Sequence, residues 1–300
     1  MQSELDRYNR GVNLESPSPV APMKFVSIAF FITISLCSAT SRGQSVLPLR
    51  IHWEKNYLTI SGESLKEREI KIHYLEACCR DRSTDADWVA HTYIGHETKL
   101  IEAASKGDFI KLACKVKDGL EVTHEIRSTL DEVSFEIVAH NPTPKRSEAH
   151  WVQPCIRLDK FTGANQETYL AKSFVFLDGK AERMPTRDWA MKARYVPGQV
   201  WRGPGIDVRD VNPRPLSKHL PSNGLIGCFS ADEKQIFATA FEPYQELFQG
   251  VAVCLHSDFR LGGLEPGETK KVRGKMYIVP ADMNALLKRY ESDFPEQIKE

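Results

Sequence analysis

The chain has 300 residues, of which 41% are hydrophobic and 27% are charged. This balance is typical of a folded globular protein and excludes a largely disordered chain. Lysine plus arginine and aspartate plus glutamate both number 40, so the formal net charge is zero. We therefore expect no nucleic-acid partner, because general nucleic-acid binders need excess positive charge to release counterions.

Residues 23–43 differ from the rest of the chain. Lys24 is followed by an apolar run from Phe25 to Leu36, and small residues come next. This is the order found in a secretory signal peptide. The apolar run is shorter than the roughly 20 residues that a membrane-spanning helix needs. An uncleaved membrane anchor over residues 25–39 is therefore the alternative interpretation.

The polar residues 1–22 resemble a tail, or they precede the true start at Met23. We expect one folded domain over residues 44–300 that is secreted or periplasmic, or anchored to a membrane if the signal segment stays uncleaved. No glycine- or serine-rich linker divides this region. All-β domains of this size commonly form a single unit.

Six cysteines follow the signal segment, and an exported protein can keep disulfides. No two of them form a CxxC pair, so the sequence predicts no metal site and no cofactor. Disulfide bridges and buried free thiols remain equally open, and the sequence cannot give the pairing. The six residues are Cys78, Cys79, Cys114, Cys155, Cys228 and Cys254.

Short runs of alternating apolar and polar residues dominate the folded region, which is the pattern of half-buried strands. The first two runs, residues 49–53 and 57–61, are separated by Glu-Lys-Asn, which predicts a hairpin. The further predicted strands are residues 69–79, 99–105, 109–117, 120–128, 132–141, 150–158, 173–179, 224–230, 235–242, 250–256 and 269–279.

The clearest strand is residues 132–141. Val133, Phe135, Ile137 and Ala139 recur at every second position and so share one face. The prolines that follow end the strand, because proline cannot continue a hydrogen-bonded ladder. Many strands with so little helix predict an all-β protein, built as a large antiparallel β-sandwich.

One helix is expected, over residues 281–294. Its apolar residues Met283, Leu286 and Tyr290 follow the helical period, and Asp282 fits the start of the helix. We expect this helix to pack on the sandwich as a C-terminal lid over apolar surface.

The segment from residue 180 to residue 221 interrupts the strand pattern with many prolines, glycines, arginines and aromatic residues. Aromatic rings can stack on sugar faces, and guanidinium groups hold carboxylates in a bidentate manner. The alternative is a structural flap with tryptophans packed inward and arginines paired to Asp188, Asp207 and Asp210. The predicted substrate-binding residues are Arg187, Trp189, Arg194, Tyr195, Trp201, Arg202 and His219.

The end of the chain carries the motif Leu264-Glu265-Pro266-Gly267-Glu268 between two predicted strands, and residues 134–158 read SFEIVAHNPTPKRSEAHWVQPCIRL. Both stretches resemble the galactose-mutarotase-like (aldose 1-epimerase-like) superfamily, over roughly residues 90–280. The resemblance implies a β-supersandwich fold and a carbohydrate ligand, neutral or anionic. It also places His150 near the position of the epimerase catalytic histidine.

The sequence departs from the epimerases on the strand before the Leu-x-Pro-Gly-Glu motif. Epimerases carry a catalytic glutamate there, whereas this strand reads Val253-Cys254-Leu255-His256. Because sugar epimerisation needs one general acid and one general base, the sequence leaves open whether the protein is an enzyme.

If the protein is an enzyme, we expect His150 and His256 to be the acid–base pair, with Asp258 fixing the tautomer of His256. A lyase would instead use Tyr195 or His219 as its base. The leading hypothesis is an exported carbohydrate-binding or sugar-modifying protein. The alternative is a non-catalytic structural or interaction domain of the cell envelope, in which the same aromatic residues belong to the core.

Overall fold

Contacts between Cα atoms divide the chain into two units, Met1–Gln44 and Ser45–Glu300, and the fold described below belongs to the second. The predicted signal segment and the residues Trp189, Arg194 and Tyr195 lie outside the described residues. No helix within the described part of the chain is long and apolar enough to cross a membrane. This computed structural model describes residues 47–66, 68–165, 168–187, 199–213, 215–249 and 253–297.

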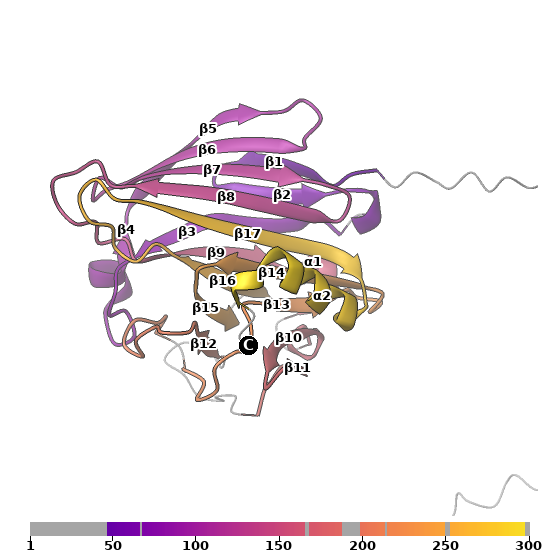
Figure 1. Cartoon of the computed structure of the whole chain (residues 1–300). Helices are drawn as coiled ribbons and strands as arrows, with labels where there is room; N and C mark the ends of the chain where they lie inside the picture. Colours follow the sequence, from indigo (N-terminus) through magenta and orange to yellow (C-terminus); the bar gives the residue numbers. More distant parts are fainter. Residues whose placement is uncertain are drawn as a thin grey trace, which may run out of the picture. The chain divides into compact units, whose positions relative to one another are not determined.

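Two antiparallel sheets face each other in a sandwich (Figure 1). The eight-stranded sheet has the order β1 (Arg50–Glu54), β2 (Tyr57–Ser61), β3 (Ile70–Cys79), β9 (Trp151–Arg157), β16 (Cys254–Arg260), β15 (Tyr244–Gln249) and β12 (Val200–Arg202), with β4 (Tyr93–Ile94) beside β3. The nine-stranded sheet has the order β11 (Lys180–Arg183), β10 (Ser173–Leu177), β13 (Ile226–Phe229), β14 (Gln235–Glu242), β17 (Thr269–Pro280), β8 (Glu132–His140), β7 (Glu121–Ser128), β6 (Phe109–Val116) and β5 (His96–Ala103).

Helices are short and few among the described residues. The longest is α2 (Met283–Asp293), near the C-terminus, and it confirms the helix predicted from the apolar period. The all-β sandwich with a C-terminal helix is therefore confirmed. The remaining helical turns are η1 (Glu63–Leu65), η2 (Trp88–Thr92), α1 (Asp159–Thr162), η3 (Leu170–Lys172) and η4 (Pro295–Gln297).

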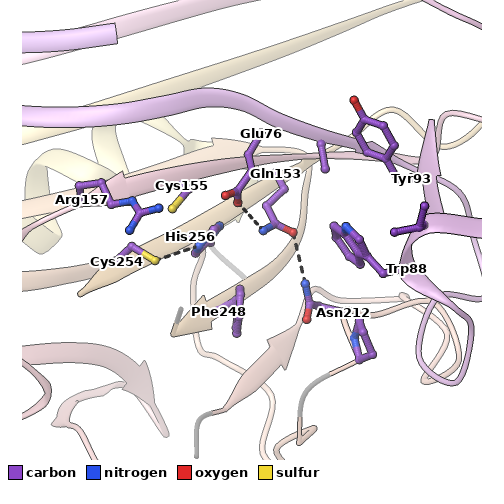
Figure 2. Close-up of a pocket in the computed structure, with 13 residues that line it drawn as sticks. Glu76, Trp88, Tyr93, Gln153, Cys155, Arg157, Asn212, Phe248, Cys254 and His256 are labelled. Carbon is purple, nitrogen blue, oxygen red and sulfur yellow. Dashed lines mark hydrogen bonds between the residues drawn. The ribbon is translucent and has the colours of Figure 1, made fainter. Parts of the chain in front are cut away.

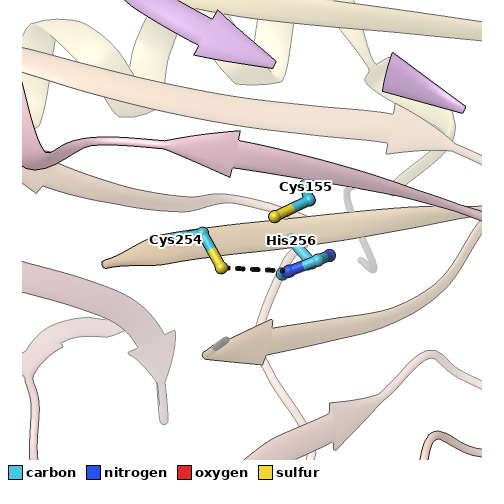
Figure 3. A group of neighbouring side chains, drawn as sticks. All are labelled: Cys155, Cys254 and His256. Carbon is cyan, nitrogen blue, oxygen red and sulfur yellow. Dashed lines mark hydrogen bonds between the residues drawn. The ribbon is translucent and has the colours of Figure 1, made fainter. Parts of the chain in front are cut away.

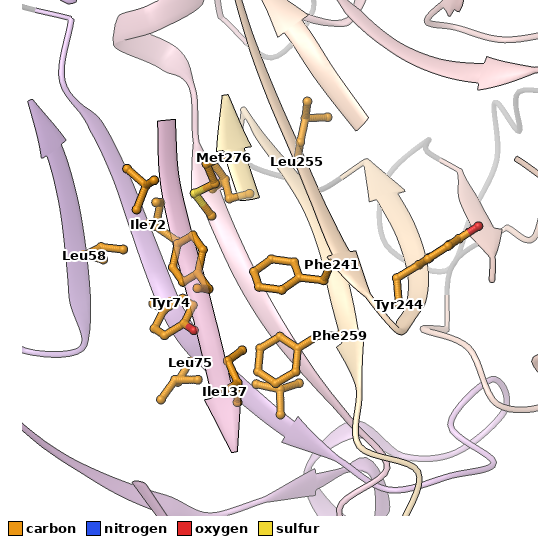
Figure 4. Close-up of a cluster of buried hydrophobic side chains, with 14 of the residues drawn as sticks. Leu58, Ile72, Tyr74, Leu75, Ile137, Phe241, Tyr244, Leu255, Phe259 and Met276 are labelled. Atoms are coloured by element: carbon orange, nitrogen blue, oxygen red, sulfur yellow. The ribbon is translucent and has the colours of Figure 1, made fainter. Parts of the chain in front are cut away.

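The main core lies between the two sheets and contains a continuous series of aromatic rings (Figure 4). Tyr74 of β3 lies 5.2 Å from Phe135 of β8, measured between ring centroids, and Phe135 lies 5.5 Å from Phe241 of β14. Phe241 in turn lies 5.3 Å from Phe259 of β16. β3 and β16 belong to the eight-stranded sheet, and β8 and β14 belong to the nine-stranded sheet. The rings therefore join the two layers through buried apolar area.

Gly274 of β17 makes room for one of these rings. A Cβ atom at this position would lie 2.2 Å from the Phe241 ring, which is far closer than real Cβ atoms approach. The absence of a side chain at residue 274 therefore lets the Phe241 ring approach the backbone of the neighbouring strand closely.

The helix α2 covers the outer face of the nine-stranded sheet. The Asp282 side chain accepts hydrogen bonds from the backbone N–H groups of Asn284 and Ala285, which caps the first turn. Leu286 and Tyr290 of the helix then pack in a second apolar cluster with residues of β10, β13, β14 and β17. This cluster confirms the prediction that the C-terminal helix packs over an apolar surface of the sandwich.

The structure corrects the prediction at the strand before the Leu-x-Pro-Gly-Glu motif. The sequence predicted a strand over residues 250–256, whereas β16 begins at Cys254 and continues to Arg260, so Asp258 lies within the strand. The neighbouring strand β15 was not expected from the sequence. All six of its residues are buried, and a strand buried on both faces shows no alternation of apolar and polar residues.

Candidate pocket on the eight-stranded sheet

A pocket of about 740 Å³ lies on the face of the eight-stranded sheet that points away from the main core (Figure 2). Leu255 and Phe259 of β16 belong to the core, so Cys254 and His256, which alternate with them, point into the pocket. The floor is formed by Glu76, Gln153, Cys155, Arg157, Cys254 and His256. The walls include Trp88, Val89, Tyr93, Asn212, Pro213 and Phe248.

A chain of hydrogen bonds crosses the floor (Figure 2). Nε2 of Gln153 donates to Oε2 of Glu76 over 2.8 Å, and Nδ2 of Asn212 donates to Oε1 of Gln153 over 3.2 Å. The backbone N–H of Asn212 donates to Oε2 of Glu246 over 3.0 Å. These bonds fix the orientation of the Gln153 amide, since its oxygen faces a donor and its nitrogen faces a carboxylate.

Three aromatic side chains line the walls. Trp88 comes from η2, whose first turn is capped by a 2.7 Å hydrogen bond from the backbone of Ala90 to Asp87. Tyr93, on β4, is 37% exposed. Phe248 of β15 lies 4.8 Å from the His256 ring, between centroids. The pocket therefore presents aromatic walls beside a polar floor.

Glu76 remains negatively charged at the pocket. Burial acts to raise its pKa, but hydrogen bonds from His73 and Gln153 and the charge of His256 bring the pKa below its usual value. A carboxylate held in this way can accept hydrogen bonds from a polar ligand.

The imidazole of His256 lies between a thiol and a carboxylate. Its Nε2 atom is 3.5 Å from Sγ of Cys254, and its Nδ1 atom is 3.7 Å from Oδ1 of Asp258. Burial acts to lower the pKa of His256, but a thiolate at Cys254 and the carboxylate of Asp258 outweigh burial and raise the pKa to about 10. The carboxylate neighbour predicted for His256 is therefore present.

Two buried carboxyl groups face each other on adjacent strands, Glu246 of β15 and Asp258 of β16. Burial, and then the nearby Asp258, raise the pKa of Glu246 well above its usual value. Burial also raises the pKa of Asp258 to about 6. Two like charges at this depth would repel each other, so protonation of Glu246 is favoured.

The six cysteines of the described region are all buried and form no disulfide, so the structure describes thiols where the sequence left disulfides open. Three side chains gather at the pocket floor: the ligand atoms of Cys155, Cys254 and His256 all lie within 4.8 Å of one another (Figure 3). The sequence contains no CxxC pair and so predicted no metal site. The pairing of β9 with β16 creates this group, and no local sequence motif carries it.

The predicted catalytic histidines occupy different surroundings. His256 lines the pocket, whereas His150 is not among the lining residues. Nδ1 of His150 lies 3.9 Å from Oδ2 of Asp210, which also accepts a 3.2 Å hydrogen bond from Arg260. The role of the two histidines as an acid–base pair stays a prediction.

None of the described residues of the predicted substrate-binding group lines this pocket. Trp201 is fully buried in the main core, and Arg202 donates a 2.5 Å hydrogen bond to the carbonyl of Ile206. Arg187 donates to Asp178 over 2.7 Å, and the backbone of His219 donates to Ser217 over 3.1 Å. Their role in binding also stays a prediction.

No protein-family model matches the chain, and no curated protein matches it at a significant level. Solved structures do match. A candidate aldose 1-epimerase from Escherichia coli K12 shares 10% identity at a TM-score of 0.42, covering 77% of this chain and 98% of that one. The Slr1438 protein from Synechocystis sp. PCC 6803 shares 9% sequence identity at a TM-score of 0.43, covering 78% of this chain and 96% of that one. A galactose mutarotase related enzyme from Lactobacillus acidophilus shares 7% sequence identity at a TM-score of 0.39, covering 77% of this chain and 97% of that one. These are structural matches at low sequence identity, to aldose 1-epimerase-like and galactose-mutarotase-like proteins among others.

Proposed function

We propose that this protein binds a carbohydrate in the pocket on the eight-stranded sheet. One observation carries the proposal: linked hydrogen-bonding groups, Glu76 and Gln153 of the floor and Asn212 of the wall, lie beside aromatic side chains. A sugar ring presents hydroxyl groups at its edge and C–H groups on its faces, so it needs both kinds of surface. The volume of about 740 Å³ falls within the range of small-molecule sites.

The polar floor supplies both donors and acceptors. The Glu76 carboxylate accepts hydrogen bonds from hydroxyl groups, and the amides of Gln153 and Asn212 can do both. Because these groups already bond to one another, their positions are set before a ligand arrives, which lowers the entropy cost of binding.

Arg157 extends the proposal to acidic sugars. It lines the pocket, and a guanidinium group can hold a uronate carboxylate through two parallel hydrogen bonds. We therefore expect uronic acids to bind along with neutral sugars. Arg157 of β9 would then bind the carboxylate of the predicted anionic ligand, and Arg187 and Arg202 would not contact it.

Binding can be tested with the purified full chain. Glucose, galactose, glucuronate and galacturonate would be titrated by calorimetry, with saturation-transfer NMR as a second readout. We expect saturable binding of at least one of them, and Arg157→Gln should weaken uronate binding more than neutral-sugar binding. Arg127→Gln, on the exposed side of the opposite sheet, is the matched control.

A glycan array decides between this function and the alternative of a non-catalytic structural or interaction domain. If no neutral or acidic glycan binds on the array, the carbohydrate proposal fails. Polarimetry of fresh α-glucose tests sugar modification separately. Loss of mutarotation in both His150→Asn and His256→Asn would support the predicted acid–base pair, and unchanged rates would oppose it.

Export from the cytoplasm is a further part of the proposal, and it depends on the sequence of residues 23–43 alone. Mass spectrometry of the protein recovered from a secreting host should give an N-terminus near residue 44. Recovery of the intact chain from the cytoplasm would contradict export, while recovery of the intact chain from membranes would favour the uncleaved anchor.

A further inference from the structure

We infer that Cys155, Cys254 and His256 form a zinc site at the floor of the pocket. The three side chains come from adjacent strands of one sheet, β9 and β16, and point toward one another (Figure 3). Two thiolates and one imidazole are ligands that Zn²⁺ prefers, and three protein ligands with one open position are the arrangement of catalytic zinc. This inference goes beyond carbohydrate binding and does not depend on it.

The distances suit a tetrahedral ion. Zn–S bonds of about 2.3 Å and Zn–N bonds of about 2.1 Å place the sulfur and nitrogen ligands about 3.6 Å apart. Sγ of Cys254 and Nε2 of His256 are 3.5 Å apart. The Cys155 ligand atom lies within 4.8 Å of both. A side-chain adjustment of about 1 Å therefore completes the three-ligand set.

The second ring nitrogen of His256 also has the neighbour that a zinc ligand needs. Metal-bound histidines usually direct their other N–H at a carboxylate, which fixes the ring and strengthens the ligand. Nδ1 of His256 lies 3.7 Å from Oδ1 of Asp258, and both Asp258 oxygens are buried without a hydrogen-bond partner among the described residues. A zinc-bound imidazole that donates to Asp258 would satisfy this carboxylate.

The charges around the group are compatible with a divalent cation. Arg157 lines the same pocket, but Zn²⁺ with two thiolates and a neutral imidazole carries no net charge, so Arg157 does not repel the ion. The carboxyl group of Glu76 lines the same pocket, and the carboxyl group of Asp258 adjoins the His256 ring. All three ligands line the pocket, so the open position faces it and can take an oxygen atom of water or of a ligand.

The site can be tested on the full chain without any sugar, so failure of the zinc site and failure of carbohydrate binding are distinguishable. Zinc content would be measured by mass spectrometry, and metal-free protein would be titrated with Co²⁺ as a spectroscopic probe. We expect one metal ion per chain and a thiolate-to-cobalt charge-transfer band. Cys155→Ser and Cys254→Ser should each weaken Co²⁺ binding at least about 100-fold, and Asp258→Asn about 10- to 100-fold.

Cys228→Ala is the matched control, because Cys228 is an equally buried thiol on the nine-stranded sheet. It should leave Co²⁺ binding unchanged. Circular dichroism would show that each variant is folded, and Cys155→Ser carries the test if Cys254→Ser does not fold. Co²⁺ binding without a charge-transfer band, or equal binding by Cys155→Ser and Cys228→Ala, would overturn the inference. So would a disulfide between Cys155 and Cys254 in the purified protein.

Discussion

Glu76 accepts a 2.8 Å hydrogen bond from Gln153 on the neighbouring strand, and both side chains lie at the pocket floor. The bond holds a charged acceptor at a fixed position. Glu76→Gln keeps the shape and removes the charge, so we expect sugar affinity to fall about 10- to 100-fold, the usual cost of losing a hydrogen bond to a charged group.

Calorimetry with the tightest-binding sugar measures this loss. Glu97→Gln is the control, since Glu97 lies on β5 of the other sheet with its side chain 72% exposed, and it should bind normally. Equal affinities for the two variants would mean that the sugar does not touch Glu76.

The buried carboxyl of Glu246 gives a prediction on pH. Its pKa is raised in the folded protein by burial and by Asp258, with His256, Asp210 and the Asn212 backbone N–H also close to it. A raised pKa means that the folded state prefers the protonated form. Its contribution to stability is therefore complete below the unfolded pKa and is lost as the pH rises toward the folded value.

Glu246→Gln stays neutral at every pH. We expect the variant to gain stability over the natural protein as the pH rises above about 4.5, by about 1.4 kcal/mol for each unit by which folding raises the pKa. Urea unfolding at a series of pH values measures the difference. A difference that does not grow with pH would show that Glu246 ionises freely in the folded state.

The close approach of Gly274 to Phe241 predicts a paired effect on stability. Gly274→Ala adds a Cβ atom that would lie 2.2 Å from the ring, so we expect a loss of about 1–3 kcal/mol from overpacking. Phe241→Leu alone should also destabilise the core. Because both changes act on one contact, the double variant should be more stable than the sum of the two losses implies.

Urea unfolding of the four proteins in this cycle provides the measurement. Strictly additive losses would show that the backbone of β17 moves to accept the new methyl group.

The cap of α2 predicts a smaller effect. Asp282→Ala removes the acceptor for two backbone N–H groups and should cost about 1 kcal/mol of stability. Asp282→Asn keeps a good capping side chain and serves as the matched control. If both variants unfold at the same urea concentration, the helix end depends on its charge or its packing and not on the cap.

The strands that could be predicted from the sequence are those with one face buried and one exposed. Along β8, Val133, Phe135 and Ile137 alternate with polar residues, and the prediction was confirmed. β15 was not predicted because both of its faces are buried, so its apolar and polar residues do not alternate. Its polar residues Glu246 and Gln249 also interrupt the apolar run that would mark a buried strand.

The pocket was harder to predict than the fold. His256 stood out because it occupies the strand where the resembling epimerases carry a glutamate. Glu76, Gln153 and Arg157 carried no signal of their own, since each looks like an ordinary polar residue on a strand. Only the order of the strands in the sheet brings them together, and one sequence does not fix that order.

The same strand order has a consequence for how the protein folds. The pocket floor combines β3, β9 and β16, whose lining residues run from Glu76 to His256 along the chain. Pairing segments so distant in sequence requires closing long loops, which is slow. A nascent chain that stops before β16 lacks Cys254 and His256 altogether, so metal or sugar binding would report that synthesis has passed β16 and that β16 has paired with β9.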